Sequence, residues 1–270
     1  VLAPEGALVD QLEGDATARA WAEFLGAPVE QTLTRDLIDA MDRAASDSRI
    51  NAMVLQLGAM TGAGMATLRD VAAAIDRFRE SGKPVIAVGD AFSQSQYYLA
   101  AHADEVWMHP DGIIFLQGFG TYRAYYREAL EKLMVDSNVF RVGEYKSFVE
   151  PWIRDDMSPE ARENNRRWLS GLWETWGDDV STARELAPGT IQRYVGGLPA
   201  ALEAAGGDFG DLALESGLVD SLVSRPDADG RLIDIAGRDP ADDGWRGVHH
   251  RDYLNVVRVE SPLPARPRQV

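Results

Sequence analysis

The sequence uses lysine so sparingly that each lysine is a candidate for chemistry that arginine cannot perform. Only three of its 27 basic side chains are lysines, namely Lys83, Lys132 and Lys146. An amine can lose its proton at accessible pH and act as a base, whereas a guanidinium group cannot. A composition bias with three leftover lysines would give the same count, so the sequence around each lysine has to decide between the two.

Two of the lysines have ordinary surroundings. Lys83 stands between Gly82 and Pro84, which predicts an exposed turn before a strand. Lys132 follows Glu128 by four residues, the spacing of a stabilising surface pair on a helix. Neither position needs an amine in preference to a guanidinium group.

Lys146 differs, because three aromatic residues stand near it, Tyr145, Phe148 and Trp152. Aromatic surroundings remove water from an ammonium group and lower its pKa, and a neutral lysine can serve as a general base. Glu144 or Glu150 would have the opposite effect if either faced the amine. The residues therefore leave two interpretations of Lys146 open, a catalytic base and a lysine in an ion pair.

Composition excludes several other classes of function. With 43 acidic residues the formal net charge is −16, which argues against a nucleic-acid partner. Cysteine is absent, so thiol catalysis, disulfides and cysteine-based zinc sites are excluded. No nucleotide-binding loop, zinc-protease motif or serine-hydrolase elbow occurs, and the four histidines lack ligand spacing. We expect no metal and no cofactor.

The sequence shows no membrane-spanning or targeting pattern. No apolar run approaches the roughly 20 residues of a membrane helix, and no signal-peptide pattern stands at Val1.

Helical and strand patterns alternate along the first half of the chain. Helices are predicted at 34–45 (capped by Thr34), 65–78, 93–103 and 121–133, and strands at 52–57, 84–89, 104–109, 113–116 and 138–142. Buried strands that alternate with helices predict an α/β fold with a largely parallel sheet flanked by helices.

A long helix is predicted over about 158–187. Ser158 suits its N-cap, and Pro159 and Glu160 suit its first turn. Its apolar face carries Trp173 and Trp176, so we expect it either to pack on another subunit or domain, for assembly, or to lie across its own sheet.

The two ends indicate a piece of a longer protein. Val1 is not an initiator methionine, and it leads directly into what is predicted as a strand. Residues 261–270 are rich in proline, which predicts an extended linker. We therefore expect a single domain over 1–260, the N-terminal half of a tandem pair, followed by a linker over 261–270 towards a second half.

The segment around Lys146 resembles the signal peptide peptidase A (protease IV) family. It reads VFRVGEYKSFVEPWIRDDMSPEAR over residues 139–162. Further resemblance lies in SGKPVIAVG at 81–89, SQSQYYLA at 93–100 and LESGLVD at 214–220. The similarity runs from about residue 30 to about residue 225.

This resemblance implies a ClpP/crotonase-like fold and a bacterial serine endopeptidase that uses a Ser–Lys dyad without histidine. Such enzymes degrade the hydrophobic signal peptides left in the membrane after cleavage. In the long form two domains occur in tandem, the first supplying the lysine and the second the serine. The family assembles as a homotetramer on the periplasmic (outer) face of the inner membrane. By this resemblance Lys146 is the general base.

The chain departs from the family pattern where a nucleophile would stand. The best register places Gln94 at the serine position, between Ser93 and Ser95. The segment GAMTGAG at 58–64 lacks the adjacent glycines expected for the oxyanion site. The resemblance thus implies the lysine-donating N-terminal half, with its own C-terminal half as a partner and any membrane anchor outside this chain.

Three alternatives remain. A self-contained dyad could join Lys146 to Ser95, or to Ser93, within one domain. The chain could also be a non-catalytic half that serves oligomerisation through the 158–187 helix. A crotonase-like lyase or hydratase acting on acyl-CoA would call for basic residues at the nucleotide phosphates and an acidic catalytic pair, and the strong acidity argues against it.

Overall fold

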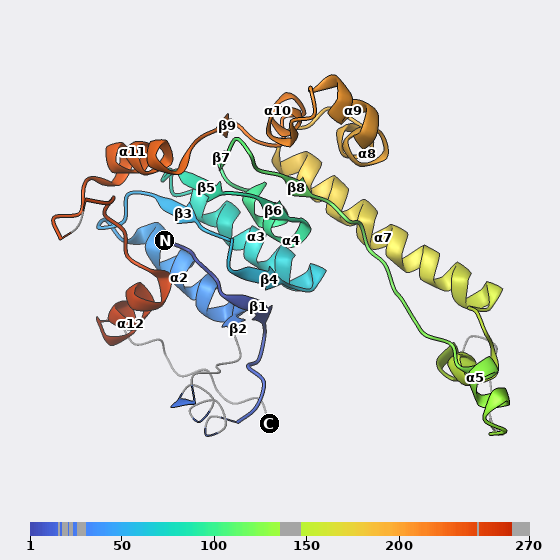
Figure 1. Cartoon of the computed structure of the whole chain (residues 1–270). Coiled ribbons are helices and arrows are strands. Elements are labelled where there is room, and N and C mark those ends of the chain that lie inside the picture. The colour runs from blue at the N-terminus through green and yellow to red at the C-terminus, as the bar shows by residue number, and fades with distance from the viewer. Residues whose placement is uncertain are drawn as a thin grey trace. The chain divides into compact units, whose positions relative to one another are not determined.

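The computed structural model of the chain describes residues 1–15, 17, 21, 24–25, 31–135, 147–241 and 243–260. Its contacts divide the chain into two compact units (Figure 1). The larger unit comprises Val1–Leu116 and Asp179–Val270, and the smaller unit comprises Gln117–Asp178. The predicted single domain over 1–260 and the linker over 261–270 stay predictions.

Parallel pairing organises the larger unit. One sheet has the strand order β3 (Met53–Leu55), β5 (Val85–Gly89), β7 (Glu105–Met108) and β9 (Ser221–Leu222). A second has the order β2 (Gln31–Leu33), β1 (Gly6–Val9) and β4 (Met60–Gly62), and β6 (Phe92–Ser93) pairs with β8 (Ile114–Phe115). Every pairing between these named strands is parallel, which confirms the predicted α/β fold.

Helices of the larger unit follow the strands in the chain. They are α2 (Thr34–Ser46), α3 (Met65–Arg79), α4 (Gln94–Ala100), α8 (Thr190–Gly196), α9 (Leu198–Ala204), α10 (Phe209–Glu215), α11 (Arg225–Ala236) and α12 (His250–Glu260). Apolar residues recur on α3 at helical spacing from Leu68 to Phe78, and each of these two side chains is buried.

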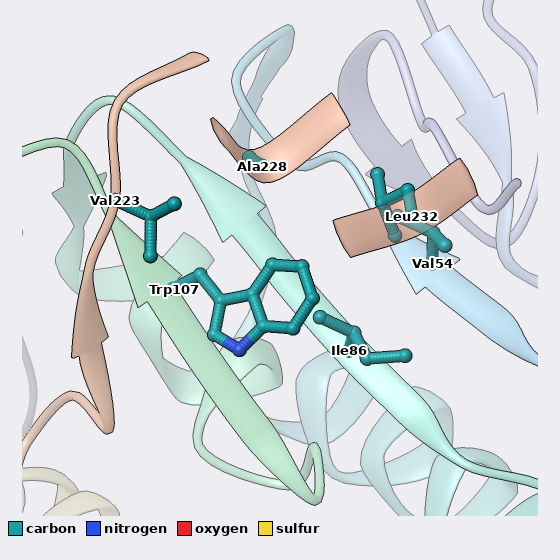
Figure 2. Packing of buried hydrophobic residues seen from close by; sticks show 6 residues of the cluster. All are labelled: Val54, Ile86, Trp107, Val223, Ala228 and Leu232. Carbon is teal, nitrogen blue, oxygen red and sulfur yellow. The ribbon is translucent and has the colours of Figure 1, made fainter. Parts of the chain in front are cut away.

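The core of this unit joins the four-stranded sheet to α11. Val54, Ile86 and Trp107 come from β3, β5 and β7, and they pack with Ala228 and Leu232 of α11 (Figure 2). A second cluster joins α2 to α12, through the four buried residues Ala40, Tyr253, Leu254 and Val257. The sheet is therefore fixed by packing from segments far apart in the sequence.

The smaller unit is largely helical in its described part. It contains α5 (Arg127–Lys132), the 3-10 turn η1 (Ser147–Val149), α6 (Glu150–Ile153) and most of α7 (Pro159–Ala183). The backbone N–H of Tyr126 donates to the Pro151 carbonyl at 2.7 Å, and the Tyr126 and Trp152 rings stack with centroids 5.4 Å apart. These contacts connect Tyr126, the residue just before α5, to α6.

Several element boundaries differ from the sequence predictions. The helix predicted over 121–133 is confined to Arg127–Lys132, and the long helix ends at Ala183 instead of residue 187. Thr34 is no N-cap, because it is already helical and its hydroxyl donates to the Val9 carbonyl at 3.1 Å. The strand predicted near the start is present as β1, which a single bridge between Leu2 and Leu55 precedes. The strand predicted over 138–142 lies outside the described residues.

The two tryptophans of α7 stack on each other, with ring centroids 5.2 Å apart. Trp176 is fully buried within the chain and Trp173 is half-buried. Trp176 is thus not available to a second subunit, whereas Trp173 keeps part of its surface exposed, and assembly through this helix stays a prediction. Across the described ranges, no helix combines the length and the apolar character that crossing a bilayer would require.

Candidate active site

The candidate nucleophile positions lie where β5 leads into α4. The chain leaves β5 at Gly89, forms the short strand β6 and enters α4 at Gln94. Parallel sheets gather functional residues at the carboxyl ends of their strands. Asp90, the first residue after β5, accepts a hydrogen bond from Arg225 Nε at 2.9 Å, and this guanidinium holds the pKa of Asp90 below its usual range.

The Ser93 side chain caps the N-terminus of α4. Its hydroxyl accepts the backbone N–H of Gln96 at 3.5 Å, while the Gln96 side-chain oxygen accepts the backbone N–H of Ser93 at 2.8 Å. This reciprocal pair is a capping box, which satisfies two otherwise unpaired N–H groups. The Ser93 hydroxyl therefore has a structural task.

The same glutamine also binds the loop that would carry an oxyanion site. Gln96 Nε2 donates to the Met60 carbonyl at 2.8 Å and lies 3.5 Å from the Gly58 carbonyl. An oxyanion hole needs N–H groups directed at the reacting oxygen. Here two carbonyl oxygens of the 58–64 segment face the first turn of α4, and a side-chain amide satisfies them.

Ser95, the other serine of this region, has a different environment from that of Ser93. Its side chain is half-buried, and a Cβ added to Gly62 would lie 4.0 Å from its Oγ. Within the described part of the chain its hydroxyl makes no hydrogen bond. The expected register places Gln94 between Ser93 and Ser95, and the structure brings all three to the N-terminus of α4.

Lys146, the predicted base, lies outside the described residues. The chain is described again from Ser147, in η1 and α6. Phe148 is 79% exposed and Trp152 is 46% exposed. Both rings are thus exposed within the described residues, and the expectation that aromatic side chains surround the amine of Lys146 stays a prediction. The third ring, Tyr145, also falls outside the described residues.

Glu150 behaves differently from its aromatic neighbours. Its side chain is 2% exposed, and its carboxylate accepts hydrogen bonds from the backbone N–H of Ser158 at 3.2 Å and from the Ser158 hydroxyl. Sequence reasoning considered Glu150 only as a possible partner of the lysine and missed this contact. The eight-residue spacing between Glu150 and Ser158 gave no helical or strand signal that could have indicated it.

The other two lysines have partners. Lys132 Nζ lies 2.9 Å from a Glu128 oxygen, which confirms the predicted surface pair. Lys83 is not simply exposed in a turn: its Nζ donates to the Ala44 and Asp47 carbonyls, each at 2.7 Å. A cation there satisfies carbonyls at the C-terminal end of α2.

The histidines do not converge on one site. His102 Nδ1 lies 3.0 Å from Asp76, and the buried His250 accepts the backbone N–H of Ala3 at 3.3 Å. Burial, assisted by His249 and Arg251, lowers the pKa of His250 to about 3. No group of three or more histidine, aspartate or glutamate side chains in the described ranges could hold a metal ion.

Comparison with known proteins decides the family. The sequence profile of Peptidase family S49 matches residues 77–234, more than half of the chain. The chain belongs to peptidase family S49. The match includes β5, the start of α4 and the segment around Lys146, whereas the 58–64 segment lies outside the matched residues.

The S49 relatives extend well beyond this chain. Protease 4 of Salmonella typhi is 39% identical over 248 residues, which cover 92% of this chain and 39% of that protein. Protease 4 of Haemophilus influenzae is 37% identical over 267 residues, covering 95% of this chain and 43% of that protein. The chain thus spans about two fifths of the length of these relatives. A chloroplastic serine protease SPPA of Arabidopsis thaliana is 27% identical over 153 residues, 57% of this chain and 22% of that protein.

Two solved structures align with most of this S49 chain at low sequence identity. An enoyl-CoA hydratase/isomerase family protein from Silicibacter pomeroyi is 17% identical, with a TM-score of 0.40 over 86% of this chain and 80% of that one. A membrane-bound stomatin-specific protease is 10% identical, with a TM-score of 0.39 over 92% of this chain and 91% of that one. The family assignment rests on the sequence matches.

Proposed function

We propose that this chain is the lysine-donating half of an S49 serine endopeptidase with a Ser–Lys dyad. The observation that supports the proposal is at the start of α4, where Gln96 satisfies the carbonyls of the 58–64 segment. The register expected from the family resemblance puts Gln94 at the nucleophile position. A half with neither nucleophile nor oxyanion donors needs a second half that supplies both. The length of the S49 relatives leaves room for one.

In this mechanism Lys146 is the general base. Its neutral amine takes the proton from a serine hydroxyl of the C-terminal half, and the serine oxygen attacks the peptide carbonyl. The protonated amine then returns the proton to the leaving nitrogen, so the acyl-enzyme forms without histidine. Backbone N–H groups of the C-terminal half stabilise the oxyanion.

The substrates we propose are hydrophobic signal peptides left in the membrane after cleavage, by resemblance to the signal peptide peptidase A family. The proposed location follows from the same resemblance, on the periplasmic face of the bacterial inner membrane. The proposed site uses no cofactor and no metal.

Self-association is part of the proposal. The smaller unit exposes a set of large apolar side chains, namely Tyr122, Leu133, Met134, Val135, Phe148, Trp152 and Trp168. Exposed apolar groups in such numbers are typical of interaction surfaces. We propose that this apolar set contacts further copies of the chain in a homotetramer.

Replacement of the base tests the proposal. In the protein with both halves, Lys146→Arg should abolish peptide cleavage and leave the oligomeric state by sedimentation unchanged, because a guanidinium group cannot accept the serine proton. Lys132→Arg is the matched control and should retain full activity, since its partner Glu128 accepts either cation. Cleavage by Lys146→Arg would refute the dyad.

One alternative has a specific observation in its favour. Ser95 Oγ has no hydrogen-bond partner in the described residues and faces Gly62, so a self-contained Ser95–Lys146 dyad is the second candidate. A fluorophosphonate probe applied to the 270-residue chain separates the two. We expect no labelling, whereas labelling that disappears in Ser95→Ala but persists in Ser93→Ala would establish the self-contained site.

A further inference from the structure

The larger unit contains a pocket that the proposed mechanism does not use. Its volume is about 430 Å³, within the range of roughly 300–1,000 Å³ that is typical of small-molecule sites. Residues of α2, β3, α3, α11 and α12 line it, together with the chain segments 1–2, 49–52 and 245–248. All of these belong to the larger unit, so the described lining comes from one compact body.

The pocket lies at the edge of the four-stranded sheet that is opposite to the candidate active site. Residues 51–54, which lead into β3 and form its start, are part of the lining. Because β3 and β5 are parallel, their amino ends share one edge of the sheet and their carboxyl ends the other. The start of α4 follows the carboxyl end of β5. A ligand in the pocket would therefore not compete with a peptide at the start of α4.

The wall of the pocket is apolar and buried. Met41, Met53 and Phe78 line it and are each at most 6% exposed. Val54 and Leu232 also line it, and they belong to the core cluster in which Figure 2 shows them close together. Burial of a ligand's apolar part against such a wall is favourable, because both surfaces leave water.

The charge of the lining is opposite to that of the chain. The chain carries 43 acidic residues, yet the lining residues that the structure describes include no aspartate or glutamate, and they include two arginines. Arg49 already pairs with Asp47 at 2.7 Å and with Glu260 at 3.0 Å. Arg246 is exposed and has no acidic partner among the described residues. One uncompensated cation thus stands at the solvent side of an apolar pocket.

Three other titratable groups on the lining add no charge at pH 8. Burial lowers the pKa of His250 to about 3 and that of the Val1 amine to about 6, and it raises the pKa of Tyr253 to about 12. A single guanidinium group matches a single carboxylate, to which it can donate two parallel hydrogen bonds. The described lining offers no second uncompensated cation for a ligand with several phosphates.

We propose that this pocket binds an amphipathic monocarboxylate of the medium-chain fatty acid type, with its apolar chain against the buried wall and its carboxylate at Arg246. Burial of the chain favours binding, and the guanidinium group fixes the orientation of the ligand. The proposal does not involve Lys146 or the dyad, so either one can fail without the other.

Titration calorimetry of the 270-residue chain with sodium decanoate at pH 8 tests this site. We expect one decanoate to bind per chain, below the concentration at which decanoate forms micelles. Arg246→Gln should weaken decanoate binding at least about tenfold, but it should change the binding of uncharged decanol by less than about twofold. Arg77→Gln is the matched control, because it removes an exposed cation of the same unit that does not line the pocket, and it should bind decanoate as the wild type does.

A second variant fills the pocket. Ala236 is half-buried at the end of α11 and lines the pocket, so Ala236→Trp should abolish the binding of both decanoate and decanol. If this variant does not fold, Arg246→Gln decides. No binding to the wild type, equal weakening in Arg246→Gln and Arg77→Gln, or normal binding in a folded Ala236→Trp would overturn the proposal. Binding to the 270-residue chain but not to the protein with both halves would also overturn it, because a further polypeptide segment would then occupy the pocket.

Discussion

The two units of this chain differ in how far they expose their large apolar residues. Those of the larger unit lie mostly inside, as Phe78, Ile86 and Tyr97 do at no more than 2% exposure, although Phe24 and Phe115 are exposed. In the smaller unit Trp176 is buried, but Tyr122 is 99% exposed and Met134 is 91% exposed. Charge follows the same division: residues 117–178 carry nine basic and eleven acidic side chains, whereas the rest of the chain carries 18 and 32.

This difference separates residues that fold the chain from residues that are free for partners. Copies of a strongly acidic protein repel one another, and the nearly neutral smaller unit is the region where that repulsion is weakest. Its apolar side chains contribute little to folding while they remain exposed to water. The larger unit should therefore account for stability, and the smaller unit for recognition.

The largest effect is expected in the core of the larger unit. Phe78→Ala removes a ring that is 1% exposed and should lower the free energy of unfolding by about 3–5 kcal/mol. Phe148→Ala, at a 79% exposed ring of the smaller unit, should change it by less than about 0.5 kcal/mol. Urea unfolding of both variants measures the two free energies of unfolding. Equal losses would contradict the proposed difference between the units.

Loss of an ion pair should likewise lower the free energy of unfolding more in the larger unit than in the smaller one, although by less than loss of a core ring. The Arg184 side chain is 8% exposed and donates to Asp220 at 2.8 Å, so Asp220→Ala would leave a buried cation with less compensation. We expect a loss of about 2 kcal/mol in urea unfolding, since Asp220 is itself partly exposed. Asp155→Ala, which breaks the exposed pair with Arg127, should not move the unfolding midpoint. A larger shift for Asp155→Ala would contradict the division.

Sensitivity to mild acid should also be confined to the larger unit, which contains all four histidines. The pKa of buried His250, about 3, is below the ordinary 6.5, so below pH 6.5 the unfolded chain binds a proton that the folded chain does not. The contribution of His250 to stability should be complete above pH 6.5 and fall as the pH drops towards 3. His250→Asn should flatten this dependence, measured by urea unfolding at several pH values. Identical slopes in this variant and in the wild type would refute the assignment.

The smallest effect on folding should accompany a clear effect on assembly. Phe148→Ser should leave the unfolding midpoint nearly unchanged but weaken self-association, measured by sedimentation equilibrium. Phe115→Ser is the matched control, because Phe115 is 52% exposed in the larger unit. Equal self-association of both variants and wild type would show that exposed apolar groups of the smaller unit serve another purpose.

Much of the fold could be predicted where periodicity is strong. Helix α3 and strand β5 follow the pattern closely, because apolar spacing and the flanking Gly82 and Pro84 mark their limits. The prediction failed over 121–126, where helix propensity had no buried face to support it, and Tyr122 is exposed there. Propensity without packing rarely sustains a helix.

The candidate site was predictable in part. The Ser93 and Gln96 spacing is that of a capping box and could have been recognised in the sequence. The contacts of Gln96 with Met60, of Glu150 with Ser158 and of Lys83 with α2 could not, because they depend on tertiary approach between segments whose spacing carries no local signal. The pairing of Lys146 with a serine stays a prediction.

The position of Gln96 has an evolutionary consequence. A single substitution, Gln94→Ser, would place a further hydroxyl at the start of α4, yet the carbonyls of the 58–64 segment would still be held by the neighbouring amide. An oxyanion site beside that hydroxyl would also require the peptide groups of the 58–64 segment to turn and Gln96 to lose its partners. Because these changes are needed together, no one substitution at residue 94 supplies both a nucleophile and its oxyanion donors.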